Sequence, residues 1–155
     1  RALREAARVL APGGRLVVCA WLAADEPRGW ARRHLLEPIV REGRLAWLPT
    51  AVELTETVRA AGFGSTRIED LTRRVRRTWT ICLRRLAAAL LSRRDYRRFL
   101  FDGGAGERVF AVTMVRIWLA YRLGAMRYGM LTARLPDRGE PGAADEARND
   151  GREHD

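Results

Sequence analysis

The spacing of apolar side chains predicts a helix followed by a strand at the start of the chain. Residues 2–11 carry apolar side chains three and four positions apart, the period of an amphipathic helix. Residues 16–21 follow as an unbroken apolar run, typical of a strand buried on both faces of a mainly parallel sheet. Pro12-Gly13-Gly14 separates the two, because proline ends a helix and both glycines allow positive φ in a tight turn. The pattern therefore predicts an α/β fold.

The next two helices have recognisable features. Residues 30–41 carry apolar side chains on one side, which predicts a helix with a kink at Pro38. Thr50 precedes another helix, with Glu53 three positions later, and this spacing predicts a capping box. Gly62 is expected to end that helix.

The second half of the chain is predicted to be mostly helical. A strand at 65–71 is followed by an arginine-rich bend and a helix over about 78–91. Helical patterns at 97–101 and 107–125 flank a glycine-rich break, and a last strand covers 128–134. We expect one domain over residues 1–135. The segment 136–155 has almost no apolar content that could pack, so it is predicted to be a disordered tail.

The charge favours anionic partners. The net charge is +10, all 29 basic residues are arginine, and residues 1–135 hold 26 arginines against 12 acids. Such a field attracts nucleic acid, an anionic membrane or a charged cofactor. Residues 67–98 contain eleven arginines and three acids beside apolar runs. A basic amphipathic helix of this kind can lie on an anionic membrane, and the alternative is a solvated face. No nucleic-acid-binding module is recognised, so nucleic acid is not an expected partner.

Metal chemistry and membrane spanning are not expected. Cys19 and Cys82 lack the spacing of a metal site, and His34 and His154 stand in different contexts. No signal peptide opens the chain, and arginines interrupt its longest apolar stretch, so no transmembrane span is predicted. The expected location is the cytoplasm, with peripheral membrane contact as an option.

One segment carries a family resemblance. Leu3–Val18 reads LREAARVLAPGGRLVV. It resembles the helix, turn and fifth strand of class I S-adenosylmethionine-dependent methyltransferases. Ala61-Gly62-Phe63 looks like that family's exit into its sixth strand, and 128–134 matches the place of the seventh, which runs antiparallel to its neighbours. The resemblance implies a partial Rossmann-like sheet made of the fifth to seventh strands.

The insertions are similar to those of the type 11 and γ-tocopherol methyltransferase-like branch. They cover about 30–47 and 76–125, and the resemblance implies that they form a helical cap and that the acceptor is small, often lipophilic. In this family a glycine-rich loop and an acidic residue at the first two strands hold the cofactor. Neither is found here, and Gly103-Gly104-Ala105-Gly106 follows a helix rather than a buried strand. We therefore expect a C-terminal fragment that is inactive alone, with S-adenosylmethionine bound mainly by a preceding part.

The resemblance also suggests site residues. It places Trp21, at the end of the first strand, beside the cofactor's sulfonium and the acceptor. The indole could stack on an aromatic acceptor or contact the sulfonium through its π face, or it could simply cover the sheet edge. His34 could remove a proton from a hydroxyl acceptor, or it could be a surface residue. Further aromatic side chains could line an apolar acceptor pocket, or belong to the core: Trp30, Trp47, Trp79, Trp118 and Tyr121.

Two functions remain open. The first is the C-terminal portion of a methyltransferase acting on a small, lipophilic or aromatic acceptor. The second is a non-enzymatic basic module that binds an anionic membrane or an acidic partner. Cofactor affinity separates the two, because only the first needs S-adenosylmethionine.

Overall fold

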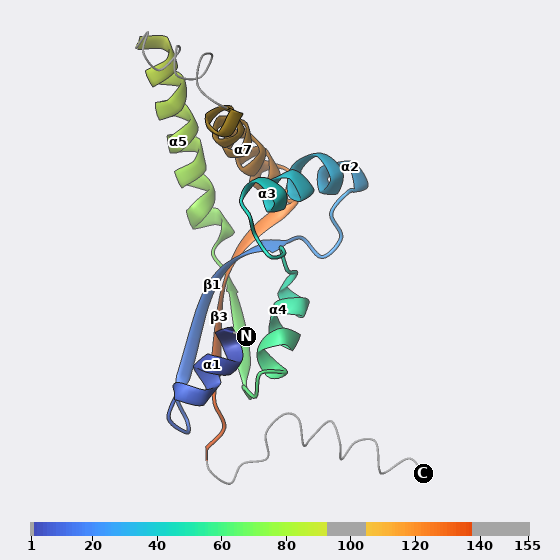
Figure 1. Ribbon diagram of the computed structural model, residues 1–155, viewed down its shortest axis with the longest axis vertical. Coiled ribbons are helices and arrows are strands. Elements are labelled where there is room, and N and C mark those ends of the chain that lie inside the picture. The colour runs from blue at the N-terminus through green and yellow to red at the C-terminus, as the bar shows by residue number, and fades with distance from the viewer. Residues whose placement is uncertain (1, 93–104, 138–155) are drawn as a thin grey trace. The chain divides into compact units, whose positions relative to one another are not determined.

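The computed structural model describes residues 2–92 and 105–137 (Figure 1). The predicted helix at 97–101 and the predicted tail beyond 137 lie outside these residues. The described helices and strands follow in chain order: α1 (Ala2–Val9), β1 (Arg15–Ala23), α2 (Gly29–Ala31), the π-helical turn η1 (Arg32–Leu36), α3 (Glu37–Glu42), α4 (Ala51–Arg59), β2 (Thr66–Asp70), α5 (Thr72–Ser92), α7 (Ala105–Arg122) and β3 (Met126–Arg134).

The chain divides into two compact units. The strand-rich unit comprises Arg1–Ala20, Pro49–Glu69 and Gly129–Asp155, and the helical unit comprises Trp21–Leu48 and Asp70–Tyr128.

The three strands form one sheet in the order β1-β3-β2. The backbone N–H of Gly64 donates to the carbonyl of Arg134, and that of Leu71 donates to the carbonyl of Tyr128. Residues later along β2 therefore pair with residues earlier along β3, so these two strands are antiparallel. The same holds for β1, where Leu135 donates to Gly14 and Ala24 donates to Ala125. The last strand is therefore antiparallel to both neighbours, while β1 and β2 share a direction. This is the strand arrangement that the family resemblance implied.

The prediction that the first strand is buried on both faces is wrong. Only Leu22 of β1 is buried, and the Val17 side chain is 53% exposed. In this sheet β1 pairs along one side only, whereas β3 pairs along both. Accordingly β3 contributes the deeply buried side chains Met126, Leu131 and Ala133, each 0% exposed.

The turn before β1 needs its two glycines for different reasons. Gly13 has φ +73°, as predicted, a conformation that side chains disfavour. Gly14 does not have positive φ, so that part of the prediction is wrong. A Cβ at Gly14 would lie 2.6 Å from the Ala11 carbonyl oxygen, which is closer than atoms pack. Backbone proximity, rather than dihedral freedom, requires glycine at position 14.

The capping box of α4 is confirmed. The Glu53 N–H donates to Thr50 Oγ1 at 3.2 Å, and the Thr50 N–H donates to Glu53 Oε2 at 2.8 Å. Gly62, with φ +98°, follows the end of the helix as expected.

The predicted helix at 30–41 forms, but with a π-helical turn in its middle. The Glu37 N–H donates to the carbonyl of Arg32, five residues back. Pro38 comes next, at the first turn of α3, where its missing N–H is tolerated. The expected kink is thus a wider helical turn immediately before the proline.

Helix α5 begins at Thr72, six residues before its predicted start. The segment expected to be an arginine-rich bend forms its first turns. Arginine is a good helix former, and the Asp70 carboxylate accepts the Thr72 N–H at 2.7 Å, which satisfies one unpaired donor of the first turn.

Each unit has its own buried side chains. In the strand-rich unit they are Leu54, Val58, Phe63, Leu131 and Ala133. In the helical unit α7 packs against α5, η1 and α3, and Figure 1 shows α7 between α5 and α3. The helical-unit core comprises Ala31, Leu35, Leu36, Ile39, Ile117, Ala120, Tyr121, Ala125 and Met126. Within residues 2–92 and 105–137, no helix combines the length and apolar content needed to cross a bilayer.

Candidate functional site

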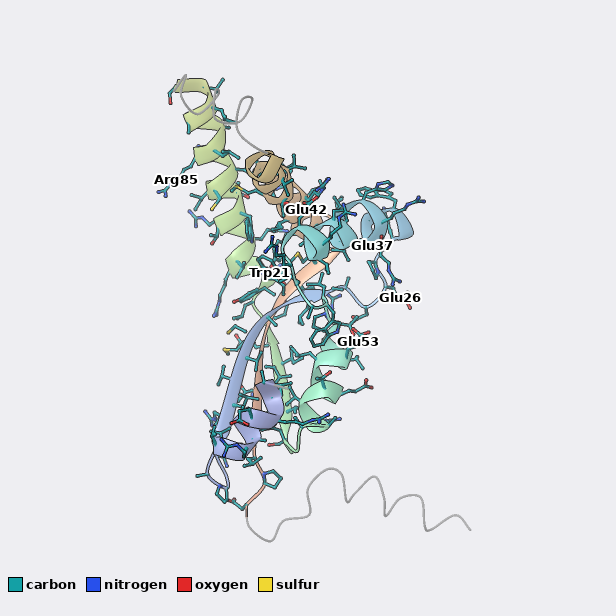
Figure 2. The ribbon with its side chains drawn as sticks, viewed as in Figure 1. Trp21, Glu26, Glu37, Glu42, Glu53 and Arg85 are labelled. Carbon is teal, nitrogen blue, oxygen red and sulfur yellow. The ribbon has the colours of Figure 1, made fainter. Side chains whose placement is uncertain are left out.

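Three of the aromatic side chains singled out in the sequence gather in the helical unit. Trp21 lies near the carboxyl end of β1, and its ring packs edge-on against Trp79 of α5, with centroids 6.0 Å apart and planes at 61°. Both indoles are partly buried and pack against the helical-unit core, which contains Tyr121 of α7. Figure 2 shows Trp21 near the first turns of α5. We call Trp21, Trp79 and Tyr121 the aromatic cluster.

The Tyr121 hydroxyl is the unusual group of the aromatic cluster. Tyr121 is only 2% exposed, and its hydroxyl has no hydrogen-bond partner among the described residues. Burial, and to a lesser extent nearby Tyr128 and Asp70, raises the pKa of the Tyr121 phenol far above its ordinary value. The phenol is therefore neutral at ordinary pH and able to donate a hydrogen bond to a ligand oxygen or nitrogen.

A small polar network lies close to this phenol. The Asp70 carboxylate accepts the Thr72 N–H, and Thr72 Oγ1 accepts the Tyr128 N–H at 3.0 Å. Burial alone would raise the pKa of the Asp70 carboxyl, but the hydrogen bonds from Thr72 and the charge of Arg127 lower it overall. Asp70 therefore stays ionised at neutral pH and pairs with the first turn of α5, while Thr72 links that turn to β3.

Tyr121→Phe is expected to leave the free energy of unfolding unchanged or to raise it by up to about 2 kcal/mol, because a buried hydroxyl without a partner costs stability. Because the Tyr121 pKa is raised in the folded protein, ionisation of this phenol favours unfolding. The free energy of unfolding should therefore be unaffected by Tyr121 ionisation below the unfolded phenol pKa of about 10 and should fall as the pH rises above it. Urea denaturation between neutral and alkaline pH measures both effects. A loss of more than about 1 kcal/mol in Tyr121→Phe, absent from Tyr128→Phe, would show that the hydroxyl has a partner.

The other predicted site residues lie outside the aromatic cluster. Trp30 is 50% exposed and stands 6.4 Å from the exposed His34 ring, between centroids. Trp47 is 48% exposed. Trp118 instead links the two long helices, because its indole N–H donates to Thr80 Oγ1 at 3.2 Å. Their roles in a site stay predictions.

A charged group between α3 and α7 was missed by the sequence reasoning. Glu42 accepts hydrogen bonds from Thr113 Oγ1 and from the guanidinium of Arg116, and its side chain is only 13% exposed. Burial alone would raise the pKa of the Glu42 carboxyl, but the bonds from Thr113 and Arg116 and the charge of Arg41 lower it overall. Partners more than 70 positions apart gave no local signal in the sequence.

Glu42→Gln is expected to cost about 1–3 kcal/mol of unfolding free energy at pH 7, because it removes a charged hydrogen-bond acceptor from a mostly buried pair. The lowered folded pKa means that this stability is present above the unfolded value of about 4.3 and is lost as pH falls through the folded pKa. Denaturation curves of both proteins should converge as the pH falls. Glu37→Gln is the matched control, because its pair with Arg32 is 3.9 Å long and mostly exposed. Equal losses in both variants would contradict the assigned role of Glu42.

The described residues contain no group of three or more His, Cys, Asp or Glu side chains that could hold a metal ion. Cys19 is exposed, Cys82 is half-buried, and both are free thiols. Ala105 and Gly106, from the glycine-rich break, form the first turn of α7, and Gly103 and Gly104 lie outside the described residues.

Solved structures share this fold. No protein-family model matches the chain, and no curated protein matches it significantly. The cyclopropane synthase MmaA2 from Mycobacterium tuberculosis aligns over 86% of this chain and 48% of its own, with 17% identity and a TM-score of 0.67. The [4+2]-cyclase SpnF aligns over 88% and 43%, with 29% identity and a TM-score of 0.62. A geranyl diphosphate methyltransferase in complex with SAM aligns over 86% and 44%, with 17% identity and a TM-score of 0.51.

The predicted resemblance is confirmed at the level of fold. The chain has the fold of the C-terminal half of class I S-adenosylmethionine-dependent methyltransferases, with the expected strands and helical insertions. It spans about half the length of the first structures that it matches. A shared fold does not by itself fix the reaction, as the cyclase among these structures illustrates.

Proposed function

We propose that this chain is part of an S-adenosylmethionine-dependent methyltransferase that acts on a small, lipophilic or aromatic acceptor. The observation that carries the proposal is the aromatic cluster near the carboxyl end of β1, the edge where ligands bind in sheets of this kind. The proposal assigns to these side chains one wall of the acceptor pocket. The domain boundaries predicted from the sequence belong to the same proposal.

The residues present fit a sulfonium cofactor at this edge. Trp21 is only partly buried, so part of its ring stays open to a ligand. An aromatic face attracts a cation, and the sulfonium is one. When bound, S-adenosylmethionine supplies the methyl group and accepts the electron pair of the breaking carbon–sulfur bond. The chain contains no glycine-rich loop after a buried strand, so we assign most cofactor contacts to residues that precede it and expect the isolated chain to be inactive.

The aromatic cluster would contribute alignment and exclusion of water. Methyl transfer requires the acceptor's lone pair to point at the methyl carbon, and a shaped apolar wall restricts the acceptor to such orientations. Trp79 supports Trp21 through its edge-on contact. The Tyr121 hydroxyl is available to donate to a polar atom of the acceptor once side chains shift to admit it. A base is not required for every acceptor, so the proposal does not depend on the exposed His34.

The test uses the full-length protein with methyl-labelled S-adenosylmethionine and a panel of prenylated, phenolic and terpenoid acceptors. We expect micromolar cofactor binding by calorimetry and labelled product from at least one acceptor class. A protein that binds the cofactor but forms no S-adenosylhomocysteine with any acceptor would exclude methyl transfer and favour a reaction such as cyclisation. Absence of cofactor binding would overturn the proposal.

One observation favours the non-enzymatic alternative, a basic module for an anionic membrane or acidic partner. Helix α5 carries six arginines and no acidic residue. Binding to an anionic surface without any affinity for S-adenosylmethionine would leave this alternative as the whole function.

A further inference from the structure

One side of α5 carries a basic surface made of two groups of arginines. Its six arginines are all exposed, whereas Val75 and Trp79 of the same helix pack against the helical-unit core. Figure 2 shows Arg85 directed away from α7. None of the six forms an ion pair with a described residue. We call this surface the arginine face, and it comprises Arg73, Arg74, Arg76, Arg77, Arg84 and Arg85 with the exposed apolar residues Ile81 and Leu91.

An arginine-rich composition alone does not produce this surface. Helices α1 and α4 interleave exposed arginines with acids, as in the Glu5–Arg8 pair of α1. Helix α4 carries Glu53 and Glu56 with Arg59. Helix α5 has 21 residues and no acid at all. The separation of charge, and not the number of arginines, distinguishes it.

Apolar side chains lie within the basic surface. Ile81 is 43% exposed, and residues four before it and three and four after it share its side of a helix. Those positions are Arg77, Arg84 and Arg85. Leu91, which is 80% exposed, lies toward the carboxyl end of the same helix. An apolar centre with a basic border is typical of helices that lie in the interface of a membrane.

We propose that the arginine face docks on an anionic phospholipid bilayer. The guanidinium groups would donate hydrogen bonds to headgroup phosphates, whose geometry they match. Ile81 and Leu91 would enter the boundary between headgroups and acyl chains. Docking goes beyond methyl transfer and does not depend on it, so either can fail alone. It would place a lipophilic acceptor in the bilayer close to the protein.

Nucleic acid fits this surface less well. Proteins that bind single strands combine positive charge with aromatic side chains on which bases stack. The described aromatic residue of α5, Trp79, faces the helical-unit core instead. An exposed isoleucine among arginines adds nothing to phosphate binding in water, whereas it gains apolar contacts at a bilayer.

The test is sedimentation of the 155-residue chain with phosphatidylcholine vesicles that contain about 30% phosphatidylserine, or none. We expect binding only to the anionic vesicles, with loss as salt is raised from about 0.1 M to about 0.5 M. Replacing Arg77, Arg84 and Arg85 by Gln should weaken binding by on the order of 100-fold, about fivefold per arginine. The Ile81→Gln variant should weaken it by about threefold.

The matched control removes three exposed arginines from the strand-rich unit, Arg59→Gln, Arg67→Gln and Arg134→Gln. The docking proposal is overturned by equal weakening in this control, or by equal binding to neutral vesicles. It is also overturned if Ile81→Gln binds vesicles unchanged while the chain prefers single-stranded RNA at equal phosphate concentration. Circular dichroism checks the helix content of each variant. If a variant unfolds, the unmodified chain still tests the docking proposal, through its binding to anionic against neutral vesicles and through the salt dependence of that binding.

Discussion

Phe63→Ala is expected to lower the free energy of unfolding by about 3–5 kcal/mol, the largest stability effect among these substitutions. The Phe63 ring is 0% exposed, and it immediately follows Gly62, whose positive φ turns the chain after α4. Val58 of the same unit is also 0% exposed. Truncation would leave a cavity that the surrounding backbone cannot fill. Urea denaturation followed by circular dichroism measures the loss.

Two controls make this result specific. Phe63→Leu keeps most of the apolar volume and should cost less than about 1.5 kcal/mol. Val52→Ala, at a side chain that is 60% exposed, should change stability by less than about 0.5 kcal/mol. A loss below about 1 kcal/mol in Phe63→Ala would contradict the packing described for the strand-rich unit.

Trp21→Ala is expected to have the largest effect on activity. In the full-length enzyme it should raise KM for the acceptor by about thirtyfold, since a buried aromatic anchor contributes about 2 kcal/mol or more to binding. The reason is the position of Trp21 near the carboxyl end of β1 and its edge-on contact with Trp79. Initial rates measured over a range of acceptor concentrations provide the value.

The matched control for Trp21→Ala is Trp47→Ala. Trp47 is a tryptophan of the same unit, 48% exposed, which should change KM by less than about twofold because little of its surface is buried. Unchanged KM in Trp21→Ala, with the cofactor still bound, would remove the aromatic cluster from the acceptor site. Equal increases in both variants would point to a general loss of folding instead.

Local signals were the part of the fold that the sequence predicted best. The capping box at Thr50 and Glu53 and the glycine turn at Gly13 involve neighbouring residues only, so their physics is complete within a few positions. The antiparallel direction of the last strand followed from the family resemblance, whereas no local feature specifies that β3 lies between β1 and β2.

Burial and long-range contacts were predicted less well. The apolar run of β1 has the composition of a central strand, yet its burial depends on which strands pair beside it. The start of α5 was placed too late, because the four arginines between Thr72 and Thr78 suggested a bend although arginine favours helix.

The candidate site could be predicted only in part. The sequence did not distinguish among the five aromatic residues other than Trp21. The fold brings Trp79 into contact with Trp21 and places Tyr121 in the core that both indoles pack against, while Trp30 and Trp47 stay exposed. Trp21 and Trp79 are far apart in the sequence, so only the fold of the helical unit brings their rings together.

The most direct test of the central claim is the coding sequence upstream of Arg1, read in frame. We expect it to encode a buried strand, a glycine-rich loop that opens a helix, and an acidic residue at the end of the next strand, the elements that hold the cofactor in this fold. A start codon immediately upstream, with none of these elements, would contradict the claim that this chain is part of a methyltransferase.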